Sequence, residues 1–145
     1  MARKYLIATH ATMAAGIRET LGILAGDTSN ISVINAFTED KDPKSTIEAF
    51  LAETPEEDEL IVMTDLMAGS VNQMFMPHLS RKNFHVVTGV NLPVVLQLVM
   101  NFDDVMTEDY ILETIEQAKS EIQYVNKAVA EFVANDTDDD DDDLF

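Results

Sequence analysis

The sequence contains no cysteine and no tryptophan, and it has few glycines and prolines. Without cysteine the chain can form neither disulfides nor thiolate metal sites, which is compatible with a reducing compartment. No apolar run approaches the ~20 residues needed to span a bilayer, and the opening Met-Ala-Arg-Lys shows no signal peptide. These absences predict a cytoplasmic protein that does not insert into a membrane.

Basic residues are also scarce. Nine Lys and Arg residues stand against 27 Asp and Glu residues, so the formal net charge at pH 7 is -18. Such a charge repels phosphate backbones and argues against nucleic-acid binding. Part of the excess lies in Asp136 and the aspartates of 138–143. Because charges this close repel one another, we expect 135–145 to be a disordered, solubilising tail. Residues 1–134 then form one domain.

Short apolar runs alternate with segments of helical period along this domain. We expect strands at 4–9, 31–36, 60–64 and 85–88, and helices at about 11–25, at 43–52, from 70 to a break at Pro77, and from about 92 onward. The runs "YLIA" and "LIVM" are apolar throughout, which is typical of strands covered on both faces. The alternation predicts an α/β fold with a doubly wound, mainly parallel sheet of order 2-1-3-4 and helices on both faces.

Residues 107–133 allow two interpretations. Apolar residues recur at a helical period over the whole stretch. The segment "EIQYVNK", residues 121–127, also reads as a strand. The pattern alone leaves both open.

A histidine and an aspartate stand where ligands bind in such a sheet. His10 ends the first strand, and Asp65 follows the third strand in "LIVMTDLMAGS". The carboxyl ends of these strands meet where the strand order reverses, so the two residues should face each other. A carboxylate that accepts the N–H of one ring nitrogen fixes the tautomer and leaves the other nitrogen free to attack. We interpret His10 and Asp65 as a candidate catalytic pair.

A turn of small residues, Ala68-Gly69-Ser70, follows Asp65 and leads into a helix. Backbone N–H groups at such a helix start attract an anion, and the Ser70 hydroxyl adds a donor. This pattern predicts a phosphate-binding loop. The plainer alternatives are that Asp65 caps the turn and that Ser70 is an N-cap.

The other two histidines are in positions that favour structural roles. His78 follows Pro77 in a helical segment, and His85 begins a strand. No cluster with metal-ligand spacing accompanies either of them. We therefore predict no metal and no cofactor.

These motifs resemble the IIA component of the mannose/fructose/sorbose family of the bacterial phosphoenolpyruvate-dependent sugar phosphotransferase system. The resemblance covers about residues 4–130 and rests on "ATHATMAAG", "VMTDLMAGSVNQ" and "VVTGVNLPVVLQL". It implies a phosphotransferase with a phosphohistidine intermediate at His10, Asp65 as its partner and Ser70 at the phosphate. It also implies HPr as phosphoryl donor and a separate IIB component as acceptor, for sugar uptake.

Two features depart from the family pattern. Members usually have glycine before the Thr-His or after the His, where this chain has Ala8 and Ala11. They usually have Gly-Gly-Ser after the aspartate, where this chain has Ala68-Gly69-Ser70. Because alanine disfavours a positive φ, the departures bear on the shape of the phosphate loop.

The resemblance also concerns the C-terminal stretch. Members are homodimers whose last strand crosses to the partner's sheet as an antiparallel edge strand. This favours an exchanged strand near residues 121–126.

Other functions fit parts of the pattern. A related phosphoryl donor for a dihydroxyacetone kinase uses the same histidine chemistry with another acceptor. A receiver-like regulatory domain also has an aspartate after the third strand, but it needs an acidic pair after the first strand to hold magnesium. That place is taken by Thr9-His10. A flavin-binding module could use the hydroxyls of Thr9 and Thr12, but aromatic residues to sandwich the flavin are missing from the expected loops. The sequence does not identify the sugar.

Overall fold

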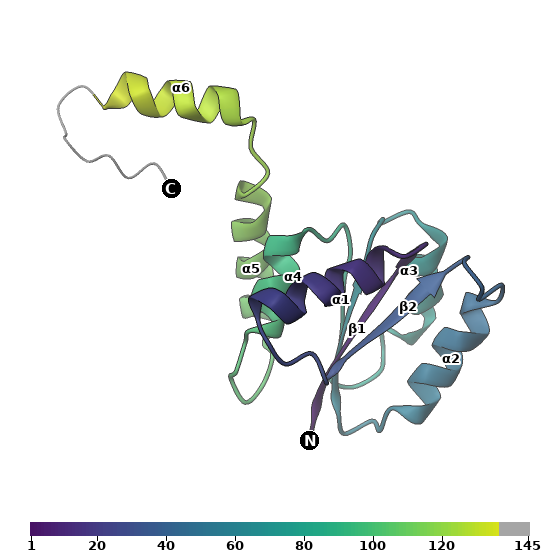
Figure 1. The fold of residues 1–145 in the computed structure, drawn as a ribbon. Helices are drawn as coiled ribbons and strands as arrows, with labels where there is room; N and C mark the ends of the chain where they lie inside the picture. The colour runs from purple at the N-terminus through teal and green to yellow at the C-terminus, as the bar shows by residue number, and fades with distance from the viewer. Residues whose placement is uncertain (137–145) are drawn as a thin grey trace.

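The computed structural model describes residues 1–136, which contain one parallel sheet (Figure 1). Its strands are β1 (Arg3–His10), β2 (Ile31–Ala36), β3 (Glu59–Thr64) and β4 (Phe84–Val87). Their order, β2-β1-β3-β4, confirms the predicted topology. All the pairings are parallel, so the carboxyl ends of the strands meet at one edge of the sheet.

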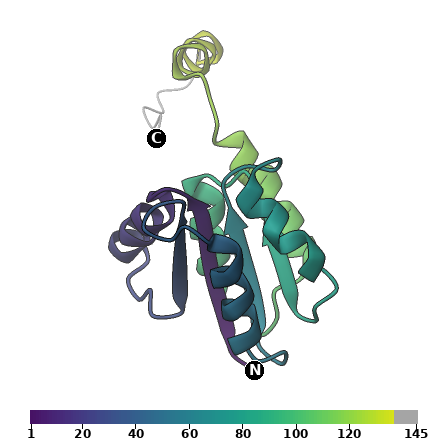
Figure 2. The ribbon, with the colours of Figure 1, turned by 90° about the vertical axis from the view of Figure 1, so that its right-hand side faces the viewer.

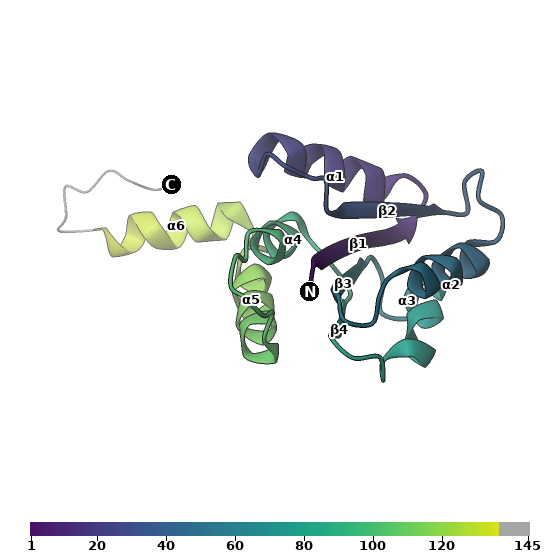
Figure 3. The same cartoon turned by 90° about the horizontal axis from the view of Figure 1, so that it is seen from below.

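Helices cover both faces of the sheet (Figures 2 and 3). They are α1 (Met13–Leu24), α2 (Pro43–Glu53), α3 (Ser70–Phe75), α4 (Leu92–Val99), α5 (Glu108–Ser120) and α6 (Val125–Asn135), with a 3₁₀ turn, η1 (Met76–His78), after α3. On one face Ile7 and Met63 pack against α1, α4 and α5. On the other face Leu6 and Val62 pack against α2 and α3. The two central strands are therefore covered on both sides, as their apolar runs predict.

Local sequence explains the helix boundaries near the site. The α3 helix ends before Pro77, whose missing N–H and ring disfavour a helix interior, as predicted. The α1 helix begins at Met13, two residues later than expected. The delay arises because Ala11 has a left-handed backbone, with φ 52°. The first turn is instead closed by the Thr9 hydroxyl, which accepts the N–H of Ala14 at 2.8 Å.

The C-terminal stretch differs from the expected strand. The α5 helix ends at Ser120, residues 121–124 connect, and α6 begins at Val125, so 121–126 is not a strand in this single chain. A strand needs a neighbour to bond its backbone groups, whereas a helix bonds its own. Figures 1 and 2 show that α6 projects from the body of the molecule. Exchange into a second chain is not tested by one copy and stays a prediction.

Two further expectations concern the acidic tail and insertion into a membrane. Of the expected acidic tail, 137–145 lies outside the described residues. Within residues 1–136, no helix is both long and apolar enough to cross a membrane.

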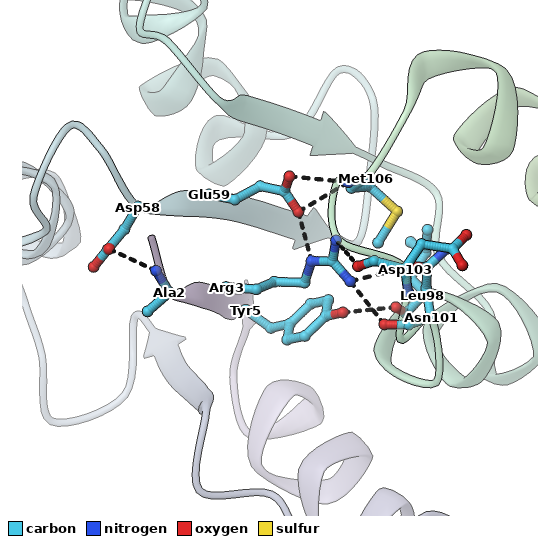
Figure 4. Close-up of polar contacts among 9 residues, drawn as sticks. All are labelled: Ala2, Arg3, Tyr5, Asp58, Glu59, Leu98, Asn101, Asp103 and Met106. Atoms are coloured by element: carbon cyan, nitrogen blue, oxygen red, sulfur yellow. Dashed lines mark hydrogen bonds and ion pairs between the residues drawn. The ribbon is translucent and has the colours of Figure 1, made fainter.

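A polar network fixes the amino end of the sheet, opposite the carboxyl ends of the strands (Figure 4). Arg3 of β1 pairs with the buried carboxylate of Glu59 on β3. It also donates to the carbonyl oxygens of Asn101 at 2.7 Å and Asp103 at 2.9 Å. Glu59 in turn accepts the Met106 N–H at 2.9 Å. The loop after α4 is thereby attached to the two central strands, and every charge in the network has partners.

Candidate active site

The structure brings His10 and Asp65 together at the switch point of the sheet. Ala8 of β1 lies opposite Thr64 of β3, so the segments that follow these two residues lie side by side at the carboxyl edge of the sheet. His10 Nδ1 is 2.8 Å from Asp65 Oδ2, and the His10 backbone N–H donates to the same oxygen at 2.9 Å. The His10 side chain is 40% exposed and that of Asp65 is 11% exposed. A half-exposed ring is thus bound by a largely buried carboxylate.

The surroundings of Asp65 favour its ionised form. Burial by itself raises the pKa of this carboxyl, but hydrogen bonds from the His10 backbone and ring and attraction to that ring outweigh it. The net result is a pKa below the usual value for aspartate. The other carboxylate oxygen, Oδ1, accepts the Leu66 N–H at 3.0 Å. An ionised acceptor beside Nδ1 keeps the proton on that nitrogen and leaves the lone pair on Nε2.

The loop after Asp65 lies beside Nε2. Ser70 Oγ is 3.5 Å from His10 Nε2. A Cβ at Gly69 would lie 3.2 Å from His10 Cε1 and 3.1 Å from the Leu66 carbonyl oxygen, so a side chain here would crowd the histidine ring and the turn. The Gly69 N–H donates to that carbonyl at 3.0 Å. The Gly69 N–H is thus engaged within the turn, and the role of Gly69 at a phosphate stays a prediction.

The departures from the family pattern have different consequences. Ala8 is a buried strand residue, and Ala68 has a negative φ, so alanine fits both positions without backbone strain. Ala11 has φ 52°, a conformation that costs a residue with a Cβ about 1–2 kcal/mol. Directly after His10, this chain therefore uses a strained alanine.

Side chains of α3 hold the loop carbonyls, which the sequence reading did not detect. Asn72, which is buried, donates to the Met67 carbonyl at 2.9 Å and accepts from the Thr64 hydroxyl at 3.0 Å. Gln73 donates to the Ala68 carbonyl at 3.1 Å. The available signal was the polar Asn-Gln pair at the end of "VMTDLMAGSVNQ".

An aromatic ring covers His10, and this too was missed. The rings of Phe37 and His10 are stacked, with centroids 5.5 Å apart and an angle of 29° between their planes. The β1–β2 register pairs His10 with Ala36, so the residue after β2 stands beside the histidine. Knowledge of this register would have identified Phe37.

The other histidines lie elsewhere. His78 Nε2 is 3.8 Å from Glu48 of α2, and His85 lies opposite Ile61 within the sheet. Across residues 1–136, no group of three or more His, Asp or Glu side chains is arranged to hold a metal ion.

Comparison with known families decides the family to which this fold belongs. The family described as the PTS system fructose IIA component matches residues 4–116. The chain belongs to this family. It is thus a IIA component of the mannose/fructose/sorbose type, and its setting is a sugar phosphotransferase system. The family also separates it from the receiver-like and flavin-binding alternatives.

Solved structures that are similar to this chain agree with its assignment as a IIA component. A protein from Klebsiella pneumoniae, described as a phosphoenolpyruvate-dependent sugar phosphotransferase system permease, is 38% identical, with TM-score 0.83; the match covers 89% of this chain and 95% of that one. A IIA protein associated with the fucose utilization operon of Streptococcus pneumoniae is 22% identical (TM-score 0.76; 89% and 97% covered). A mannose/sorbose-specific IIA subunit from Enterococcus faecalis is 17% identical (TM-score 0.73; 86% and 95% covered). The last two share the fold. The comparison with curated proteins gives no match.

Proposed function

We propose that this IIA component accepts a phosphoryl group from phospho-HPr on Nε2 of His10 and passes it to a separate IIB component. The observation that carries the proposal is the pairing of Nδ1 with Asp65 at 2.8 Å. This pairing keeps the proton on one ring nitrogen and directs the lone pair of the other toward the Ser70 side of the site.

The transfer needs no proton movement on His10. The Nε2 lone pair forms the new N–P bond while the bond between phosphorus and the donor nitrogen breaks, and Nδ1–H remains bonded to Asp65. Phosphorylation makes the ring cationic, and the adjacent carboxylate balances that charge. The Ser70 hydroxyl and the backbone N–H groups of Ala68 and Ser70 are the donors we propose for the phosphoryl oxygens.

Site-specific labelling tests this function. The protein is incubated with phosphoenolpyruvate, enzyme I and HPr, and the phosphorylated residue is mapped by mass spectrometry at neutral or basic pH. We expect phosphate on His10 and none in His10→Ala, with His78→Ala and His85→Ala as matched controls that label normally. Phosphate on His78 or His85 in the wild type would contradict the assignment. Discharge by IIB supports the sugar system, whereas discharge only by a dihydroxyacetone kinase supports the alternative acceptor.

We also propose that the protein is a homodimer through its C-terminal stretch. Ile122, Tyr124 and Val125 are 76%, 71% and 58% exposed, an apolar surface that a second chain could cover. Light scattering at micromolar concentration should give twice the 16.1 kDa chain mass. Asp substitutions at Ile122 and Tyr124 should yield monomers. A wild-type monomer that accepts phosphate normally would exclude the exchange.

A further inference from the structure

Phe37 adopts a backbone conformation that its type disfavours, next to the reactive histidine. Its φ is 62°, in the left-handed region where a bulky side chain is an outlier. Such strain in a folded protein is a reason to look for a function of the residue. Neighbouring hydrogen bonds hold the turn: the Thr38 hydroxyl donates to the Asn35 carbonyl at 2.7 Å, and the Ala11 N–H donates to the Ala36 carbonyl at 2.9 Å.

Burial does not explain this aromatic ring. Phe37 is 50% exposed and belongs to neither hydrophobic core of the sheet. Its ring stacks on that of His10, with 5.5 Å between the centroids. The side chain thus contributes little to the core and is placed directly against the imidazole.

The other contacts of His10 leave one motion of the ring unrestrained. The hydrogen bond from Nδ1 to Asp65 fixes one atom of the imidazole, but the ring can still tilt about that bond. The Gly69 backbone approaches the Cε1 edge, and Ser70 lies at 3.5 Å from Nε2. A ring stacked on one face of the imidazole opposes this tilt and keeps Nε2 directed toward the side of the site where Ser70 lies.

We propose that Phe37 is a positioning residue, which holds the plane of the His10 imidazole so that Nε2 is aligned for phosphoryl transfer. This rests on the proposed transfer at His10. Phe37 itself takes no part in bond making, and it acts through the face of the histidine ring. An aromatic pair contributes about 0.5–1.5 kcal/mol beyond its buried area. Loss of the stacked Phe37 ring should therefore slow transfer by about two- to tenfold.

Three variants test the proposal. Phe37→Leu removes the aromatic plane and retains an apolar side chain, whereas Phe37→Tyr keeps the plane. Phe102→Leu is the matched control, because Phe102 is 86% exposed beside Asn101, at the amino end of the sheet. Transfer to each protein is followed by rapid quench with two donors: phospho-HPr, and phosphoramidate, a small molecule that needs no docking surface.

We expect Phe37→Leu to be slowed with both donors, and Phe37→Tyr and Phe102→Leu to react at the wild-type rate. With phospho-HPr the loss should lie in kcat and leave KM unchanged. A defect confined to phospho-HPr and to KM would overturn the proposal, because it would make Phe37 part of the donor-docking surface. Equal rates for the wild type and Phe37→Leu would overturn it as well.

The position of the His10 ring is measured independently by NMR of the unphosphorylated protein. The Hε1 and Hδ2 resonances should carry a ring-current shift in the wild type and Phe37→Tyr, and lose it in Phe37→Leu, while Nδ1 stays protonated in all three. Unchanged shifts in Phe37→Leu would refute the stacking. If the wild type is not phosphorylated at His10 at all, the proposed function fails, and the NMR result still decides whether Phe37 holds the ring.

Discussion

Replacing Asp65 by alanine tests whether the carboxylate serves the reaction or only the turn. The change removes the acceptor for three N–H groups: the His10 ring and backbone through Oδ2, and Leu66 through Oδ1. A hydrogen bond to a charged group is worth about 1.5–3 kcal/mol. If the ring bond acts mainly in the transition state, phosphoryl transfer should slow by about one to two orders of magnitude.

Asp65→Asn separates the charge from the hydrogen bonds. Its single carbonyl oxygen can replace Oδ2 or Oδ1 but not both, so an amide that accepts from His10 turns its NH₂ toward the Leu66 N–H. We expect transfer between that of the wild type and Asp65→Ala. We also expect a loss of folding stability of about 1–3 kcal/mol from the opposed donors.

The assay is rapid-quench transfer from phospho-HPr together with thermal melting of the same samples. A slowed transfer in correctly folded protein supports the catalytic pairing. Wild-type transfer in Asp65→Ala, accompanied by a lowered melting temperature, would refute the reasoning and leave Asp65 as a cap of the turn.

Three further predictions follow from the same edge of the sheet. Ala11→Gly should raise the free energy of unfolding in urea melts by about 1 kcal/mol. Removing the strain of a left-handed alanine gains about 1–2 kcal/mol, which exceeds the cost of glycine's greater backbone freedom, about 0.5–1 kcal/mol. A lower free energy of unfolding would contradict the strain. Gly69→Ala should slow labelling of His10 by about tenfold or more, since its Cβ would lie 3.2 Å from Cε1. Gly16→Ala is the control, because nothing lies within 4 Å of a Cβ at that position. Equal rates for the two variants would exclude the crowding. The folded pKa of Asp65 is below its unfolded value, so its stabilisation is present above about pH 4 and is lost as the pH falls through the folded pKa. The free energy of unfolding should therefore fall less with decreasing pH in Asp65→Ala than in the wild type. Parallel curves for the two proteins would contradict the depressed pKa of Asp65.

The sheet and the proximity of His10 and Asp65 could be predicted because each depends on a short local pattern. Apolar runs define the buried strands, and a parallel sheet places their carboxyl ends together whatever the side chains between them are. Once the strand order was inferred, the residues that end β1 and follow β3 had to meet.

Phe37 and Asn72 could not be predicted because their roles depend on register and rotamer. One residue of shift between β1 and β2 would place Phe37 away from His10. Asn72 fills a gap between Thr64 and the loop that exists only after α3 packs on the sheet. In the single chain 121–126 is not a strand, and the exchanged strand stays a prediction, because 121–127 fits both periods and the outcome depends on which neighbour is present.

The network at the amino end of the sheet has a consequence for vectorial synthesis. Arg3 is made early, yet the carbonyl groups that accept its hydrogen bonds belong to Asn101 and Asp103, about a hundred residues later. Closing a loop of this length is slow relative to local helix formation. Until the segment around Met106 has left the ribosome, Glu59 cannot receive its backbone donor. Nascent chains that stop short of this point therefore hold the histidine and its aspartate without the contacts that lock the opposite end of the same two strands.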